Sequence, residues 1–161
     1  MKSILWIIGL AILVLVANWA YQAWRAPADT TSDMQIVKVY FNESRPTEIV
    51  QVAVDREVLV SEDVQKLAES AIEVLLNGPT AEEHEQGLST AIQDGSVMNY
   101  VKVEGSVATV DFNDIFDFQL GGSAQVLAIR GQIEKTLTQF DEIDEVKITI
   151  NKGEREAVLE P

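Results

Sequence analysis

The side chains of this chain best suited to chemistry are Asp111, Asn113, Asp114 and Asp117, four oxygen-bearing residues close together. Hard oxygen ligands at this density are those that Ca²⁺ prefers. An EF-hand loop, however, requires a central Gly and a terminal Glu at fixed spacing, and this segment has neither. We therefore interpret the segment as a strand end and a turn, in which Asp and Asn side chains bond nearby amides.

His84 is the only histidine of the chain, and it lies among Glu82, Glu83 and Glu85. A zinc site would need further His or Cys ligands, and the sequence has no Cys and no second His. The surrounding negative charge favours protonation of the imidazole, which leaves a pH-sensing role open. We interpret the segment as a solvated acidic helical turn.

Three serines beside Gly-containing loops raise the question of a nucleophile. The sequence has no Gly-x-Ser-x-Gly elbow, and a lone His in an acidic run is a poor triad base. Free amides at Gly121 and Gly122 could bind an anion, but Asp117 and the net charge oppose it, so we favour a tight turn into a helix that Ser123 caps. The three serines are Ser89, Ser96 and Ser123.

Carboxylate pairs for glycoside hydrolysis carry little weight in so acidic a chain, because such pairs arise by chance. We interpret the acidic residues near the C-terminus as a solvated edge. The sequence therefore predicts no catalytic, cofactor-binding or metal-binding residues and no enzyme. The edge residues are Glu134, Asp141, Glu142, Asp144 and Glu145.

Composition divides the chain into an apolar segment and an acidic domain. The 161 residues carry a formal charge of -14, and 18 of the 21 residues from 4 to 24 are apolar. This charge argues against a nucleic-acid partner, since binding to phosphates needs a basic face. We predict an N-terminal transmembrane anchor over residues 1–25, a flexible linker over 26–34 and a globular domain over 35–161.

Residues 4–24 would span about 31 Å as a helix, close to the thickness of a bilayer's hydrocarbon core. Lys2 and the terminal amine favour a cytoplasmic N-terminus, so we expect a single-pass cell-membrane protein with its C-terminal domain outside the cytoplasm. A cleaved signal peptide is the alternative, but Ala26-Pro27-Ala28 is a poor cleavage site. Either way the domain is exported. Aromatic residues that favour the headgroup region close the segment: Trp19, Tyr21 and Trp24.

Hydrophobic periodicity predicts two amphipathic helices, one over 64–76 with Ser61 as N-cap and Gly78 at its end, and one beginning at Ser123. Thr80 is expected to cap a short acidic turn, and Gly105 to form a hairpin turn. The expected fold is α+β, a two-layer sandwich with two helices on one mixed or antiparallel sheet of four to six strands. The expected strands are 36–41, 48–54, 98–103, 107–112, 146–150 and a last edge strand at 157–159.

A series of turn and cap residues follows in a fixed order along the chain: Leu75-Leu76-Asn77-Gly78-Pro79, Glu82-Glu83, Gly87-Leu88-Ser89, Asp94-Gly95-Ser96, Val107-Ala108-Thr109-Val110-Asp111, Gly121-Gly122-Ser123 and Gln132-Ile133 through Phe140. In this order and spacing they resemble the GerMN ("Germane") domain of sporulation and spore-germination proteins. The resemblance covers about residues 36–155. Where the family usually has a Pro before the loop Gly this chain has Gln93-Asp94-Gly95, and in place of Asp-Gly after the last strand it has Asn151-Lys152-Gly153.

The resemblance implies an exported, often membrane-anchored bacterial domain, similar in fold to ring-building modules and acting in interaction rather than catalysis. We expect a protein partner in the cell envelope, with a homo-oligomer as one form of it, although a like-charged domain opposes self-packing. The alternative is a module that binds peptidoglycan or a small ligand through aromatic side chains. Most aromatic side chains of the domain fall at core-like positions, so we favour packing, and Phe112, Phe116 and Phe118 mark the one place to look for an exposed patch.

Overall fold

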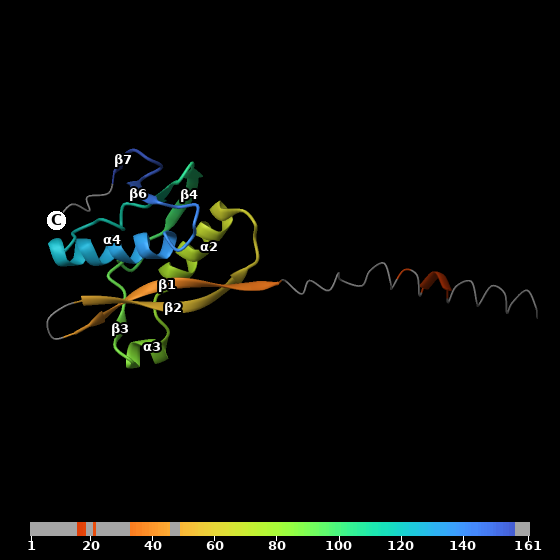
Figure 1. Ribbon diagram of the computed structural model, residues 1–161, viewed down its shortest axis with the longest axis horizontal. Helices are drawn as coiled ribbons and strands as arrows, with labels where there is room; N and C mark the ends of the chain where they lie inside the picture. Colours follow the sequence, from red (N-terminus) through yellow and green to blue (C-terminus); the bar gives the residue numbers. More distant parts are fainter. Residues whose placement is uncertain (1–15, 19–20, 22–32, 46–48, 157–161) are drawn as a thin grey trace, which may run out of the picture. The chain divides into compact units, whose positions relative to one another are not determined.

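The computed structural model describes residues 16–18, 21, 33–45 and 49–156 of the chain, which divides into two compact units, residues 1–32 and 33–161. The second unit has an α+β fold (Figure 1). Its elements are β1 (Met34–Ser44), β2 (Ile49–Leu59), α2 (Val64–Leu76), α3 (Ala81–Glu85), β3 (Leu88–Ser89), β4 (Met98–Glu104), β5 (Val107–Phe112), α4 (Ser123–Leu137), β6 (Glu145–Ile150) and β7 (Arg155–Glu156).

The strands form two sheets, with the orders β2-β1-β3 and β4-β5-β6-β7. The prediction of one sheet with four to six strands is therefore wrong, whereas the α+β class is confirmed. β1 and β2 are an antiparallel pair in continuous register from Met34–Leu59 to Ser44–Ile49. β5 and β6 are parallel, and α4 is the crossover between them.

The sheets are separate because the edge of β1 that faces away from β2 is occupied. The short strand β3 pairs there with Asn42 and Glu43, and side chains of α4 and of Gln139, two residues past its end, bond to Lys38 and Tyr40. Gln139 accepts from the Lys38 amide and donates to the Lys38 carbonyl, both at 2.7 Å. Thr136 Oγ1 accepts from the Tyr40 amide at 3.2 Å, and Gln132 Nε2 donates to the Tyr40 carbonyl at 2.9 Å. At Lys38 and Tyr40, backbone groups that would otherwise pair with another strand thus bond to side chains, so the first sheet ends with the two-residue strand β3 and does not continue into the second sheet.

The core lies between the two sheets and the helices α2 and α4. Both predicted amphipathic helices are present, and each buries apolar residues at helical spacing: Ala68, Ala71, Ile72 and Leu75 on α2, and Val126, Ile129, Ile133 and Leu137 on α4. Phe112 and Phe116 stack within the core, with ring centroids 4.0 Å apart. The largest fully buried apolar side chains are Phe41, Phe112, Phe116, Ile72, Leu75, Ile129, Ile133, Leu137, Ile150, Val39 and Val101.

Two of the three predicted helix caps are wrong. The N-cap of α2 is Asp63, whose carboxylate accepts from the amide two residues later, while Ser61 bonds only to Asp63. The N-cap of α4 is Gly122, at φ 96°, and Ser123 is already the first helical residue. Thr80 does cap α3, in a full capping box.

Several strand limits differ from the prediction. β2 continues to Leu59 because its partner β1 begins at Met34 and the hairpin stays in register. β3 was not predicted; it is only two residues long and pairs with β1. The last strand is β7, at Arg155–Glu156, and the predicted edge strand at 157–159 lies outside the described residues.

The N-terminal prediction is largely outside the part of the chain that the structure describes. Of residues 4–24, only 16–18 and 21 are described, and they are helical. Within the described residues, no helix has the length and apolar character needed to cross a membrane.

Candidate functional site

Asp111, the first residue of the predicted acidic cluster, is fully buried near the end of β5. Its Oδ1 accepts from Asn99 Nδ2 and from the Lys152 amide, both at 2.7 Å. Its Oδ2 accepts from Thr149 Oγ1 at 2.7 Å and from the Gly153 amide at 2.8 Å. All of these donors belong to other strands or to the β6–β7 turn, not to the nearby amides that the sequence suggested.

The β6–β7 turn depends on this carboxylate. Asn151, Lys152 and Gly153 have φ values of 55°, 63° and 83°, and this left-handed conformation is costly for the two that are not Gly. It directs successive amides to one point, where Asp111 binds them as an anion in a backbone nest. Burial raises the pKa of Asp111, but the four hydrogen bonds outweigh it and lower the pKa overall. Asp111 therefore holds the turn in place.

The other acidic residues of the cluster bind the same turn from outside. Asp114 Oδ1 accepts from Asn151 Nδ2 at 2.6 Å. Asp117 forms a two-pronged ion pair with Arg155, in which Nη2 lies 2.9 Å from Oδ1 and Nη1 binds Oδ2. Among the described residues, no group of three or more His, Cys, Asp or Glu side chains is arranged to hold a metal ion.

Asn113 faces away from this turn and joins two loops. Its Oδ1 accepts from the Val97 amide at 3.1 Å, and its Nδ2 donates to the Gly95 carbonyl at 3.0 Å. We call residues 93–97 and 113–119 together the loop pair. The amide of one side chain thus fixes the loop after β5 against the loop before β4.

The loop pair exposes apolar side chains. Phe118 is 61% exposed, and Val97 and Ile115 are about half exposed. Of the three phenylalanines considered for an exposed patch, Phe112 and Phe116 are packed in the core, as favoured, and Phe118 is exposed. Sequence reasoning missed Val97 and Ile115, which resemble ordinary core residues in type. Their position between Gly, Asp and Asn residues was the available signal.

A hollow of about 390 Å³ lies beside Phe118. The Asp117–Arg155 ion pair forms part of its wall, so an aromatic ring lies next to charged groups. The residues that line it are Asp114, Asp117, Phe118, Gln119 and Arg155.

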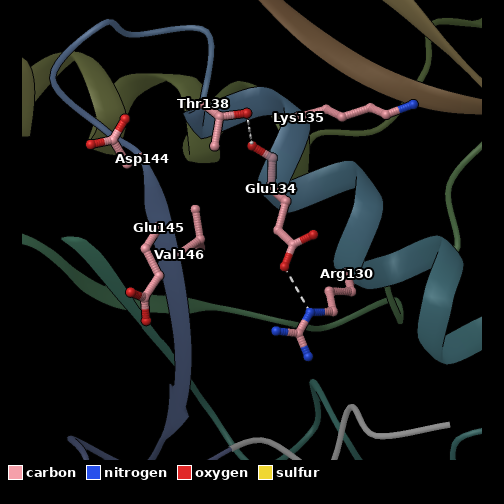
Figure 2. A pocket seen from close by; sticks show the side chains of 7 residues that line it. All are labelled: Arg130, Glu134, Lys135, Thr138, Asp144, Glu145 and Val146. Carbon is pink, nitrogen blue, oxygen red and sulfur yellow. Dashed lines mark hydrogen bonds and ion pairs between the residues drawn. The ribbon is translucent and has the colours of Figure 1, made fainter. Parts of the chain in front are cut away.

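A second hollow of similar size lies between α4 and β6 (Figure 2). Arg130 and Glu134 form an ion pair along the helix at 2.7 Å, and Thr138 donates to the Glu134 carbonyl at 2.8 Å. Asp144 and Glu145 are exposed, as are Asp141 and Glu142, so the predicted solvated edge is confirmed for these four residues. The lining residues are Arg130, Glu134, Lys135, Thr138, Asp144, Glu145 and Val146.

His84 is exposed on α3, as predicted for a solvated acidic turn. Its neighbour Glu83 is different, because it binds Arg56 of β2 through both oxygens at 2.8 and 2.6 Å. The hydrogen bonds from Arg56 lower the pKa of Glu83 to about 2, because they outweigh the rise that partial burial causes. This ion pair docks α3 onto the first sheet and was not visible in the sequence.

The serines and glycines considered as nucleophile or anion sites are not brought together. Ser89 donates to the Asn42 carbonyl within the first sheet, and Ser123 is exposed at the start of α4. The Gly121 amide already donates to Gln125 Oε1 at 2.6 Å, so it is occupied within the chain. No hydrogen bond joins His84 to a serine within the described residues.

Solved structures with the same fold include GerM domains. The first GerMN domain of the sporulation protein GerM from Bacillus subtilis is 26% identical, with a TM-score of 0.58, over 76% of this chain and 85% of that one. The tandem GerMN domains of the same protein are 18% identical, with a TM-score of 0.58, over 80% of this chain. This chain spans 43% of the tandem structure.

A putative lipoprotein from Clostridium perfringens shares the fold at 16% identity and a TM-score of 0.52, over 83% of this chain and 85% of that one. No curated protein matches the chain significantly. The sequence profile described as "Germane: Sporulation and spore germination" matches residues 38–156, from within β1 to the end of β7. The chain therefore belongs to the Germane family of sporulation and spore-germination domains.

Proposed function

We propose that this chain is a non-enzymatic interaction domain of the cell envelope, acting in sporulation, germination or envelope assembly. Residues 4–24 anchor it in the cytoplasmic membrane with the N-terminus inside the cell, and the domain that follows binds a partner protein outside the cytoplasm. The family supports the setting, and the apolar sequence of residues 4–24 supports the anchor.

The distribution of polar groups supports binding rather than catalysis. The most buried carboxylate, Asp111, and the buried amide Gln132 both use their oxygens within the fold. A catalytic acid or base must instead face a site where substrate can reach it. Asp111 and Gln132 thus hold the fold together and are not directed to a substrate.

The observation that carries the proposal is the exposure of Phe118. An aromatic side chain 61% exposed on a loop fixed by hydrogen bonds is typical of an interface anchor. Val97 and Ile115 lie on the same loop pair and extend its apolar surface. We favour a heterotypic partner, because a domain with this charge repels its own copies.

Site-specific photo-crosslinking in the native host tests this proposal. A photoreactive phenylalanine at position 118 should yield a heterotypic adduct of defined mass, whereas the same residue at position 127 should not. Leu127 is the control matched in exposure, because it is 54% exposed and lies on α4 rather than on the loop pair. Equal adducts at both positions would contradict a specific interface, and an adduct of twice the chain's mass would indicate a homo-oligomer.

A second candidate function is the binding of peptidoglycan or a small ligand in the hollow beside Phe118. The adjacent Arg155 and Asp117 favour it, since sugar sites combine an aromatic face with polar groups. Retention of the purified chain on peptidoglycan at moderate salt, lost on Phe118→Ser but kept on Leu127→Ser, would support it. Absence of retention would leave the protein partner as the function.

A further inference from the structure

The open end of the first hairpin exposes apolar side chains on the face that points away from the core. Met34 is 50% exposed, Leu59 58% and Ile36 65%. Met34 and Leu59 are register partners, and Ile36 lies two residues along on the same face of β1. We call these three residues the hairpin patch.

The opposite face of this hairpin end packs against helix α2. Val37 and Val58 are buried there against Ala71 of α2. An antiparallel sheet that is covered on one face normally carries polar side chains on the other. Further along the open face the rule holds, because Lys38 pairs with Asp55 at 3.0 Å. The hairpin patch is the exception and therefore points to a surface that covers it.

The patch lies where the chain enters the domain. The Val60 amide donates to the Asp33 carbonyl at 2.9 Å, which fixes the first described residue of the domain beside the end of β2. Only nine residues separate Trp24, the end of the apolar segment, from Met34. Fully extended, this linker spans at most about 36 Å. A domain on so short a linker stays close to the surface in which the apolar segment is held.

We propose that the hairpin patch rests on the outer surface of the lipid bilayer. This inference depends on the membrane anchor of the proposed function and adds to it a defined orientation of the domain. Apolar side chains on the edge of a peripheral domain enter the boundary between headgroups and acyl chains. The hairpin patch is an exposed apolar surface of this kind, and it lies at the end of the domain where the linker enters.

Charge favours lipid over a second copy of the chain. Glu57 is the register partner of Ile36, and Asp33 lies beside Met34, so the margin of the patch is acidic. Two copies packed through this patch would bring these carboxylates together at low dielectric. An uncharged lipid surface meets the apolar side chains without that repulsion.

The absence of Cys from the chain allows a clean test by site-specific labelling. The full chain, with Ile36→Cys or Leu59→Cys carrying an environment-sensitive fluorophore, is reconstituted into phosphatidylcholine vesicles. Val97→Cys and Leu127→Cys are matched controls, since both side chains are also a little over half exposed. Lipids with a quencher high on the acyl chain should quench labels at 36 and 59 about threefold more than the controls.

The possible outcomes separate the anchor from the orientation. A chain that does not float with the vesicles contradicts both the anchor and this inference. A chain that floats, but whose four labels are quenched equally, contradicts the inference and leaves the anchor standing. Shielding of positions 36 and 59 that disappears as the protein is diluted in lipid would identify a second copy as the occupant and overturn the lipid proposal.

Discussion

The replacement Asp111→Asn tests whether one buried carboxylate holds the turn between β6 and β7. The substitution keeps the shape of the side chain but supplies one acceptor oxygen where the structure uses two. Thr149 can rotate its hydroxyl to accept from the new amide. The backbone amides of Lys152 and Gly153 have no such freedom, and one of them is left facing an N–H group.

The expected loss of stability follows from these contacts. Hydrogen bonds to a charged acceptor contribute about 1.5–3 kcal/mol each and neutral ones about 1, so discharging the site and leaving one donor unpaired costs about 3 kcal/mol. Urea unfolding of residues 33–161, followed by circular dichroism because this part has no Trp, measures the loss. Asp114→Asn is the control: its side chain is 70% exposed, and we expect a change below about 0.5 kcal/mol.

At acid pH the free energies of unfolding of the wild type and of Asp111→Asn should become equal. Because the folded pKa of Asp111 is lowered, its contribution is fully present above the unfolded pKa of about 3.9 and is lost as pH falls through the folded value. The stability gap should therefore be constant near neutrality and narrow below about pH 4. An Asp111→Asn domain as stable as the Asp114→Asn control, or a gap that does not change with pH, would refute this account.

Three further substitutions test other contacts by the same unfolding measurement. Glu83→Gln should cost about 1–2 kcal/mol at pH 7 through the loss of the Arg56 ion pair, and this cost should shrink as pH falls from 4.5 toward the folded pKa of about 2; an unchanged cost at low pH contradicts it. Gln132→Leu removes the buried amide that bonds β1 and the segment before β4, and should cost about 3 kcal/mol. Lys152→Gly relieves a left-handed backbone and should stabilise the domain by about 0.5 kcal/mol, so any destabilisation speaks against strain there.

The helices and most strands could be predicted because their signals are local. Ile129, Ile133 and Leu137 repeat at helical spacing, and a repeat of this kind needs only a sheet to pack against. Gly78 and Gly105 take the left-handed conformations that their positions required, at φ 73° and 60°. Local chemistry was sufficient for these elements.

The division into two sheets could not be predicted, because it depends on contacts between distant parts of the chain. Gln132, Thr136 and Gln139 look like polar residues on the outer side of a helix. They instead bond to Lys38 and Tyr40, more than 90 residues away. The spacing of four places Gln132 and Thr136 on one side of α4, and Gln139 follows two residues past its end, but only the structure shows that a strand edge lies there.

The acidic cluster shows the same limit at the candidate site. Asp111 was expected to bond nearby amides, but its donors lie 12 to 42 residues away. Phe116 and Phe118 have the same type and similar neighbours, yet one is buried in a stack and the other is exposed. The exposure of Phe118 depends on how its loop is held. Asn151 of the β6–β7 turn bonds to Asp114, and Arg155 of β7 bonds to Asp117, and no local sequence pattern predicts these contacts.

The two exposed apolar surfaces have consequences for the partner when they are considered together. β1 begins with the hairpin patch at one end of the domain, and α4, which follows the loop pair, begins toward the other end (Figure 1). If lipid covers the hairpin patch, the loop pair is directed away from the membrane. The loop pair that bears Phe118 also carries the exposed residues Asp94 and Asp114. A partner complementary to this end has an apolar pocket with a basic rim, and its rate of association should fall as salt screens that attraction.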